Sequence, residues 1–421
     1  MKENIIIHDF IDVAIQSGGW MLLDRVCLNN RIISLIGEPT ESVEFDEEKI
    51  RTSKELLKEL LEIAISNNRV SRNDVKGLAE MSSELRDILT PPPSVVNALF
   101  SQYYETSEKE ATDYFHLMNV TNGYIEKNIS SQEEVVVKKS HFMVQTKLET
   151  SHFEEAEICD YCFESEGYGK LNNRNKRIIR MNVKGESWGF SYSQKPIIKE
   201  ECIFMPEEHK PMIINRQLQE TMLNLLDIYP HYFITYNPKV VSELTHGYLY
   251  GGEASTPLIQ AENDFMFDIP GFVTVSASLV EWPVSVIRLK TTSKKNLINV
   301  IEYLTLKWQQ YSYPSLDIIA KTEDGLDLHT VISTFRKEEE AYVAELILQD
   351  ASEAFVRTPD YEALLSNKEN KVDFLGVVNL KDHNLTNEEI TSVMEGNYEK
   401  QQIFKKTPEG QQAFVRFIDT L

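Results

Sequence analysis

The first third of the chain carries apolar residues at helical spacing. Residues 5–17 place isoleucines and a phenylalanine at positions i, i+3 and i+4, and the pattern stops at Gly18. Thr52 and Glu55 have the spacing of a capping box, and a leucine-rich stripe follows them. We therefore predict a mainly helical N-terminal region over residues 1–130.

The remainder of the chain alternates short strand-like runs with a few longer helical patterns. Helical spacing recurs over 215–228 and 293–311. Several predicted strands follow one another directly, which is typical of α+β proteins with largely antiparallel sheets. The strand-like runs are 135–137, 141–145, 177–180, 233–236, 273–279, 284–289 and 342–348.

The charge balance narrows the classes of partner. The chain has 421 residues, with 43 Lys and Arg against 66 Asp and Glu, which gives a net charge of −23. A protein this acidic is a poor candidate for binding a nucleic-acid backbone or an anionic membrane, because both need clustered basic residues. The sequence has no run of 18 apolar residues and its start does not resemble a signal peptide, so we predict a cytoplasmic protein with reduced cysteines.

One pair of cysteines has metal-ligand spacing. Cys159 and Cys162 lie three residues apart, and two such thiolates can bind one zinc ion from a tight turn. A single pair is weak evidence, since two buried and unreactive thiols would give the same pattern. Two further ligands would be needed, and His209 and His246 are the candidates.

Glycines cluster around the second of these histidines. Gly247 follows His246 directly, and Gly251-Gly252 close the same segment. Such glycines allow close approach of a ligand such as a phosphate, but an ordinary turn would have the same composition. Neither a dinucleotide-binding nor a P-loop glycine motif occurs in the chain.

Ten segments, spread in order along nearly the whole chain, resemble one protein family. The family is the bacterial type 2 UDP-glucose–hexose-1-phosphate uridylyltransferases, usually called galactose-1-phosphate uridylyltransferases. The matching segments are 22–26, 89–97, 159–168, 177–179, 185–188, 208–212, 230–233, 244–246, 282–289 and 367–370.

This resemblance implies a fold and a reaction. The fold consists of two related histidine-triad-like halves with antiparallel sheets, here assigned to residues 131–265 and 266–421 behind the helical region. The reaction belongs to galactose metabolism, in the Leloir pathway. A histidine takes the uridylyl group from UDP-glucose and passes it to galactose 1-phosphate, which is covalent catalysis by double displacement. The resemblance also suggests a homodimer.

The resemblance retains a complete set of ligands for a structural zinc ion. The cysteine pair of the family falls on Cys159 and Cys162. Its next histidine falls on His209, and the first histidine of its His-x-His motif falls on His246. The expected ion would tie the nucleotide loop to the cysteine turn.

The catalytic positions differ from the family pattern. Tyr248 stands where the family has its nucleophilic histidine, and Tyr250 stands where a glutamine would contact a phosphoryl oxygen. Asn237 matches an asparagine near the substrate phosphates, while Pro92 replaces an arginine. A phenol has a pKa near 10, so about one in a thousand is ionised at neutral pH. The residues therefore leave three hypotheses open: an active uridylyltransferase, a catalytically impaired homologue that binds nucleotide sugars or a partner, and a single-step transferase or hydrolase.

A second metal-binding group of the family is only partly matched. The glutamate of that group falls on Asp264, and its histidine pair falls on Leu364 and Leu365. Its remaining histidine falls on Leu328, or on His329 if the alignment shifts by one residue. Leucine cannot ligate a metal, so we predict that this group is lost.

Overall fold

The computed structural model describes residues 4–39, 51–126, 129–137, 139–147, 158–168, 174–236, 246–366, 370–381 and 385–421. The chain forms two compact units. The first comprises Met1–Lys127, Ser151–Pro196 and Cys202–Lys210, and the second comprises Asn128–Thr150, Ile197–Glu201 and Pro211–Leu421. The predicted boundaries near residues 130 and 265 stay predictions.

The first unit begins with helices whose starts are set by local capping. Asn4 accepts hydrogen bonds from the first turn of α1, and Thr52 and Glu55 form the predicted capping box of α3. Helices α1 to α4 share one apolar core, with Phe10, Ile32 and Leu60 fully buried. The helices are α1 (Ile5–Gln16), α2 (Arg25–Ile36), α3 (Ser53–Ser66), α4 (Val75–Ile88), α5 (Pro93–Tyr104) and α6 (Glu108–Thr121).

A short antiparallel sheet completes the first unit. Its strands are β3 (Ile179–Val183), β4 (Glu186–Tyr192) and β5 (Cys202–Pro206), paired in that order. Aromatic side chains of α5, α6 and β4 pack together, with the rings of Phe115 and Phe190 5.4 Å apart. This sheet positions the residues that follow β5.

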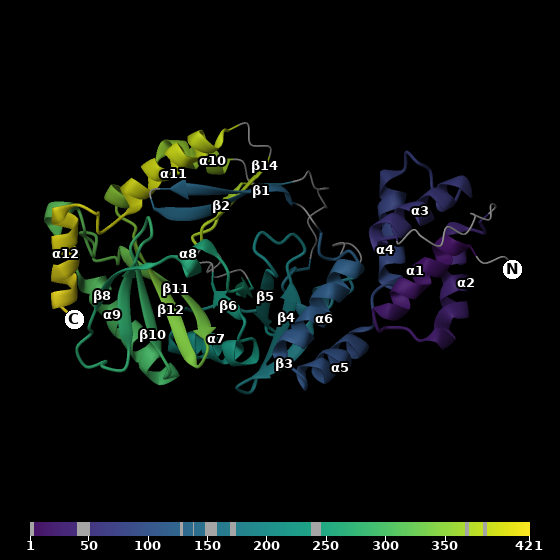
Figure 1. Cartoon of the computed structure of the whole chain (residues 1–421), viewed down its shortest axis with the longest axis horizontal. Helices are drawn as coiled ribbons and strands as arrows, with labels where there is room; N and C mark the ends of the chain where they lie inside the picture. Colours follow the sequence, from purple (N-terminus) through teal and green to yellow (C-terminus); the bar gives the residue numbers. More distant parts are fainter. Residues whose placement is uncertain are drawn as a thin grey trace. The chain divides into compact units, whose positions relative to one another are not determined.

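The second unit is built on a longer antiparallel sheet in the order β7-β6-β11-β12-β10-β9-β8. Helices α7 (Arg216–Ile228) and α9 (Lys294–Gln310) pack against its central strands (Figure 1). Both helices match the predicted patterns, because their apolar stripes face the sheet. The strands are β6 (Tyr232–Thr235), β7 (Leu249–Glu253), β8 (Asn263–Phe267), β9 (Ser276–Val280), β10 (Val286–Thr291), β11 (His329–Glu338) and β12 (Ala341–Asp350).

A second sheet of this unit joins distant parts of the sequence. Its order is β1-β2-β14-β13, and the contact between β2 and β14 is parallel. Helix α11 packs against β1, and α10 and α11 lie along this sheet in Figure 1. The elements are β1 (Ile129–Val137), β2 (Ser140–Lys147), α10 (Pro359–Ser366), β13 (Lys371–Val372), β14 (Val377–Lys381), α11 (Asn387–Gln401) and α12 (Pro408–Asp419).

The fold agrees with the predicted class and differs in detail. The α+β architecture with mainly antiparallel sheets and a helical N-terminal region is confirmed. The strand predicted over 273–279 begins later, at Ser276, because Phe272 and Val275 make turn hydrogen bonds and Gly271 has a φ of +85°. Amide groups that form hydrogen bonds within a turn are not available to pair with a neighbouring strand, so the strand begins only after the turn.

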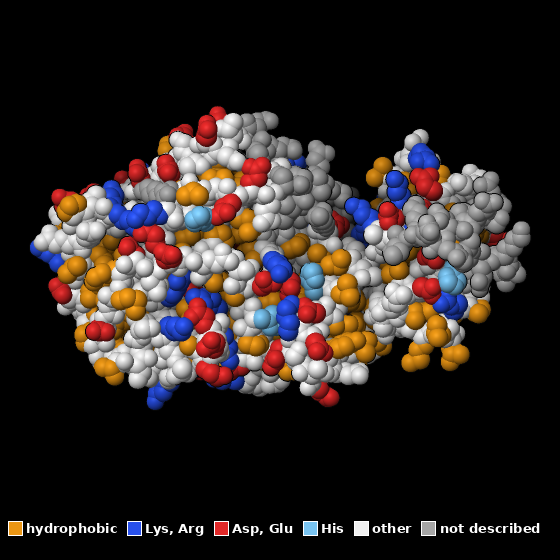
Figure 2. Space-filling model, viewed as in Figure 1, with side chains coloured by type: hydrophobic (Ala, Val, Ile, Leu, Met, Phe, Trp, Pro, Cys, Tyr) orange, Lys and Arg blue, Asp and Glu red, His pale blue; other side chains and the backbone are white. Residues whose placement is uncertain are grey.

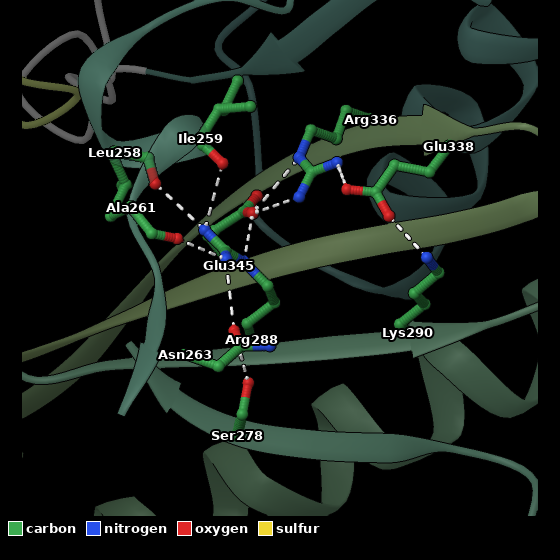
Figure 3. Close-up of polar contacts among 10 residues, drawn as sticks. All are labelled: Leu258, Ile259, Ala261, Asn263, Ser278, Arg288, Lys290, Arg336, Glu338 and Glu345. Atoms are coloured by element: carbon green, nitrogen blue, oxygen red, sulfur yellow. Dashed lines mark hydrogen bonds and ion pairs between the residues drawn. The ribbon is translucent and has the colours of Figure 1, made fainter. Parts of the chain in front are cut away.

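A buried ion network fixes the short helix α8 (Pro257–Gln260) to the sheet (Figure 3). Glu345 is fully buried on β12, and its Oε1 accepts hydrogen bonds from Arg288 and Arg336. The Arg288 Nη2 atom also donates to the carbonyl oxygens of Leu258 and Ile259, at 3.0 and 3.3 Å. Because these carbonyls belong to α8, the arginine connects the helix to the central strands.

The surface carries both charges. On the face of the molecule shown in Figure 2, basic side chains are interspersed with acidic ones. Among the helices that the structure describes, none combines the length and the apolar character needed to cross a membrane.

Candidate active site and metal centre

The cysteine pair lies in a tight turn of the first unit. The Cys162 amide donates to the Cys159 carbonyl at 3.1 Å, and a short 3-10 helix, Phe163–Ser165, follows directly. Ser165 is buried and accepts a hydrogen bond from Lys176 Nζ at 2.8 Å. This turn therefore holds both sulfur atoms on a rigid local frame.

His209 lies three residues beyond β5 and reaches the cysteine turn. Its Nδ1 atom is 3.0 Å from Cys162 Sγ. Burial, reinforced by the neighbouring Cys159, raises the pKa of the Cys162 thiol to about 12. A thiol in this environment becomes a thiolate when a cation binds beside it, because the cation compensates the buried charge.

The four predicted ligands form one cluster. The ligand atoms of Cys159, Cys162, His209 and His246 all lie within 4.8 Å of one another. Two thiols and two imidazoles match the donor set that zinc prefers in tetrahedral sites, and the Zn–S and Zn–N bonds of about 2.0 to 2.3 Å fit within this spacing. The cluster could therefore hold a metal ion.

Gly247 and Gly252 accommodate close approach of other parts of the chain. A Cβ atom on Gly247 would lie 2.3 Å from Met212 Cβ and 2.5 Å from the Met212 nitrogen. A Cβ atom on Gly252 would lie 2.9 Å from the Lys199 carbonyl oxygen. The contacts explain both glycines by close chain packing, whereas the sequence left a ligand and a turn as alternatives.

The two tyrosines of the loop are partly buried at the start of β7. Tyr248 precedes the strand, and Tyr250 is its second residue, paired with Thr235 of β6. Residues two apart in an extended segment point to the same face, so both side chains share one side of the strand. Asn237, the other predicted substrate contact besides Tyr250, lies outside the described residues.

The structure adds Asp373, which sequence reasoning missed. The Tyr250 hydroxyl donates to Asp373 Oδ2 at 3.1 Å, and the Leu375 amide donates to Asp373 Oδ1 at 2.8 Å. Burial raises the pKa of Asp373 to about 6. Burial and the nearby Asp373 carboxylate also raise the pKa of Tyr250 well above its usual value, which keeps this phenol neutral. No local sequence pattern predicts a role for Asp373, because its hydrogen-bond partner Tyr250 lies 123 residues earlier in the chain.

At the positions of the expected second metal-binding group the structure shows an ion pair, a buried leucine and a buried histidine. Asp264 lies 3.6 Å from Lys406 Nζ, and Leu364 is buried in α10. His329 is fully buried, with Nε2 at 3.0 Å from Asp350 and its ring stacked on Trp308 at 3.9 Å. The imidazole is thus part of the core.

Curated relatives show the family. The chain is 30% identical over 382 residues to galactose-1-phosphate uridylyltransferase of Enterococcus faecalis, covering 83% of this chain and 75% of the relative. It is 31% identical over 373 residues to galactose-1-phosphate uridylyltransferase 2 of Streptococcus pneumoniae, covering 82% and 74%. The chain belongs to the galactose-1-phosphate uridylyltransferase family. The Lactobacillus helveticus member is 32% identical over 375 residues, again covering 82% and 74%. The family consists of nucleotidyl-transferring enzymes of galactose metabolism.

Other comparisons add less. No family model matches the chain. Yeast Ap4A phosphorylase Apa2 is structurally similar with a TM-score of 0.42 and 10% sequence identity, over 70% of this chain and 93% of the yeast protein. A likeness this distant does not establish a shared topology.

Proposed function

We propose that this protein exchanges a uridylyl group between UDP-glucose and galactose 1-phosphate. The supporting observation is the 30 to 32% identity, over more than four fifths of the chain, to curated galactose-1-phosphate uridylyltransferases. In the first half-reaction a protein nucleophile bonds to the α-phosphorus and glucose 1-phosphate leaves. In the second half-reaction galactose 1-phosphate takes the uridylyl group and frees the nucleophile.

Tyr248 is the proposed nucleophile. Its phenolic oxygen would form the bond to the α-phosphorus, and the bond to the glucose 1-phosphate oxygen would break. The phenolic proton would pass to solvent water during this attack, and glucose 1-phosphate would leave as an anion that exchanges protons with solvent. Tyr250 and Asn237 are the proposed contacts to the substrate phosphates.

A structural zinc ion is the proposed cofactor. Cys159, Cys162, His209 and His246 would hold it, and their mutual spacing fits a tetrahedral ion. Bound zinc would supply a rigid cross-link between its ligands. Its role would be to orient the backbone that leads from His246 to Tyr248.

The deciding experiment measures formation of UDP-galactose from UDP-glucose and galactose 1-phosphate. We expect slow turnover by the natural protein and a loss of at least a hundredfold in Tyr248→Phe, because losing a covalent nucleophile removes most of the rate. We expect Tyr248→His to be faster than the natural protein, since imidazole is far more often in its nucleophilic form near pH 7. Incubation with UDP-glucose alone should leave a uridylyl adduct, detected by intact mass spectrometry.

The adduct also distinguishes the chemistry. A uridylyl group on tyrosine is a phosphodiester and survives mild acid, whereas one on histidine is an acid-labile phosphoramidate. Turnover by Tyr248→Phe at the natural rate would contradict Tyr248 as nucleophile. Absence of turnover in both the natural protein and Tyr248→His, with UDP-glucose still bound, would instead indicate an impaired homologue.

Two further properties belong to this proposal. We propose the cytoplasmic location that the sequence predicts and the homodimer that the family resemblance suggests. Fractionation of the native cells and light scattering of the purified chain would test them.

A further inference from the structure

We propose that Asp373 is a positioning residue for Tyr250, and that binding of a nucleoside diphosphate sugar is coupled to uptake of one proton by the Asp373 carboxylate. The inference rests on the proposed function, because it places the diphosphate of the substrate beside Tyr250. It goes beyond that function by naming a residue that controls how the phenol meets its ligand.

Asp373 and a bound phosphoryl group would compete for the single hydroxyl proton of Tyr250. A tyrosine hydroxyl has a single O–H donor, and the Tyr250 hydroxyl donates to Asp373 Oδ2 at 3.1 Å. While this bond exists, Tyr250 can offer only lone pairs to a phosphoryl oxygen, which needs a donor. A glutamine at this position has a separate amide donor and would not meet the conflict.

Protonation of Asp373 resolves the conflict. A proton taken from solvent onto Oδ2 lets the carboxyl group donate to the Tyr250 oxygen. The Tyr250 O–H group then turns to donate to the phosphoryl oxygen, and no covalent bond to carbon or phosphorus changes. Neutralising Asp373 also removes a negative charge beside an incoming dianion.

The surroundings of Asp373 favour such a switch near neutral pH. Burial raises its pKa to about 6, with Glu201 acting in the same direction. The Leu375 amide, the Tyr250 hydroxyl and Lys371 act in the opposite direction. Among the residues that the structure describes, Tyr361 and Tyr398 also interact with it, and both are buried tyrosines with raised pKa values that remain neutral. Asp373 is therefore mostly ionised at pH 7.5 in the free protein and needs a proton to release Tyr250.

The turn that carries Asp373 is held in place on two sides. The Leu258 amide of α8 donates to the Leu375 carbonyl at 2.9 Å. Arg288 in turn donates to the Leu258 carbonyl (Figure 3). Gly376 has a φ of +98°, and a Cβ atom there would lie 2.7 Å from Pro257. The turn thus has little freedom to move Asp373 away from Tyr250.

This rigidity makes Asp373→Asn a sharp test. The Leu375 N–H group still needs an oxygen as its hydrogen-bond acceptor. The asparagine would therefore direct Oδ1 toward Leu375 and Nδ2 toward Tyr250. The Nδ2 group is only a donor, so Tyr250 would accept from it and keep its own O–H free at every pH. Asp324→Asn, an exposed change with the same loss of charge, is the matched control.

The measurement is calorimetric binding of UDP-glucose between pH 5.5 and 8.5, in buffers with different ionisation heats. We expect the natural protein and Asp324→Asn to take up close to one proton at pH 7.5. Their affinity should fall by up to tenfold per pH unit above pH 6. Asp373→Asn should take up no proton and bind roughly thirtyfold more tightly than the natural protein at pH 7.5, because only about 3% of Asp373 is protonated there.

Two further binding measurements test whether the proton uptake depends on the diphosphate and on the Tyr250 hydroxyl. Uridine lacks the diphosphate, so its binding should show no coupled proton. Adding Tyr250→Phe to Asp373→Asn should abolish most of the gain in affinity, because the phenol is then missing. Binding of UDP-glucose by the natural protein without pH dependence or proton uptake would overturn this inference and leave the proposed function intact. Absence of binding by both the natural protein and Asp373→Asn at every pH would overturn both.

Discussion

At the scale of single residues, His329 shows how a polar side chain is used inside the core. Both ring nitrogens have partners, with Nδ1 at 2.8 Å from the Trp308 carbonyl oxygen and Nε2 at 3.0 Å from Asp350 Oδ2. Burial alone would raise the pKa of Asp350, but the hydrogen bonds with His329 and Ser352 outweigh it and lower the pKa. The pair therefore stabilises the fold above about pH 4, and its contribution is lost as the pH falls through the lowered value.

We predict that His329→Leu destabilises the protein by about 2 to 4 kcal/mol at pH 7, because it leaves the Asp350 carboxylate buried without its main partner. Urea unfolding followed by tryptophan fluorescence would measure the change. The double variant with Asp350→Leu should recover part of the loss, since it removes the unpaired charge. A change below 0.5 kcal/mol in His329→Leu would show that this contact contributes little.

At the scale of elements, the network around Glu345 links three strands and a helix. Its Oε1 serves Arg288 of β10 and Arg336 of β11, while Glu345 itself lies on β12. Arg336 and Lys290 in turn contact Glu338 near the sheet margin. One buried carboxylate is thus shared by two mostly buried guanidinium groups on the central strands of this sheet.

We predict that Glu345→Leu costs about 3 to 5 kcal/mol of unfolding free energy, because it leaves two mostly buried arginines without their shared partner. Glu338→Gln, a change in the same network at a carboxylate that is 39% exposed, should cost about 1 kcal/mol or less. Chemical denaturation of both variants would test the contrast. Equal losses in the two variants would contradict the assigned importance of burial.

At the scale of the whole molecule, the proposed zinc ion should raise global stability, because a ligand that binds only the native state stabilises it by mass action. We predict about one zinc per chain by elemental analysis and a lower melting temperature after treatment with a strong chelator. Cys162→Ser should lose the metal and the response to chelator. The matched control Cys27→Ser, at an exposed cysteine, should keep both. Near-zero zinc after expression in zinc-replete medium would contradict the proposal.

Local features of the fold were predictable because their causes are local. The apolar stripe of α1 and the capping box of α3 are each complete within about a dozen residues, and the structure places both helices close to the predicted positions. The spacing of Cys159 and Cys162 indicated a possible ligand pair because the two residues are close together in the sequence. The pattern at 273–279 failed because a turn formed inside it, which apolar spacing alone does not show.

The sequence by itself determined the fold class and the family, and the resemblance to that family predicted the four residues that the structure brings together as a possible metal site. The same resemblance predicts that Tyr248 stands at the nucleophile position and Tyr250 at a phosphate-contact position. Only the tertiary structure decided what surrounds them. Asp373 accepts a hydrogen bond from Tyr250, which lies 123 residues away in the sequence. Gly247 lies so close to Met212 that a larger side chain would not fit. Such contacts arise when β-strands and turns distant in sequence pack together, and no periodicity along the chain records them.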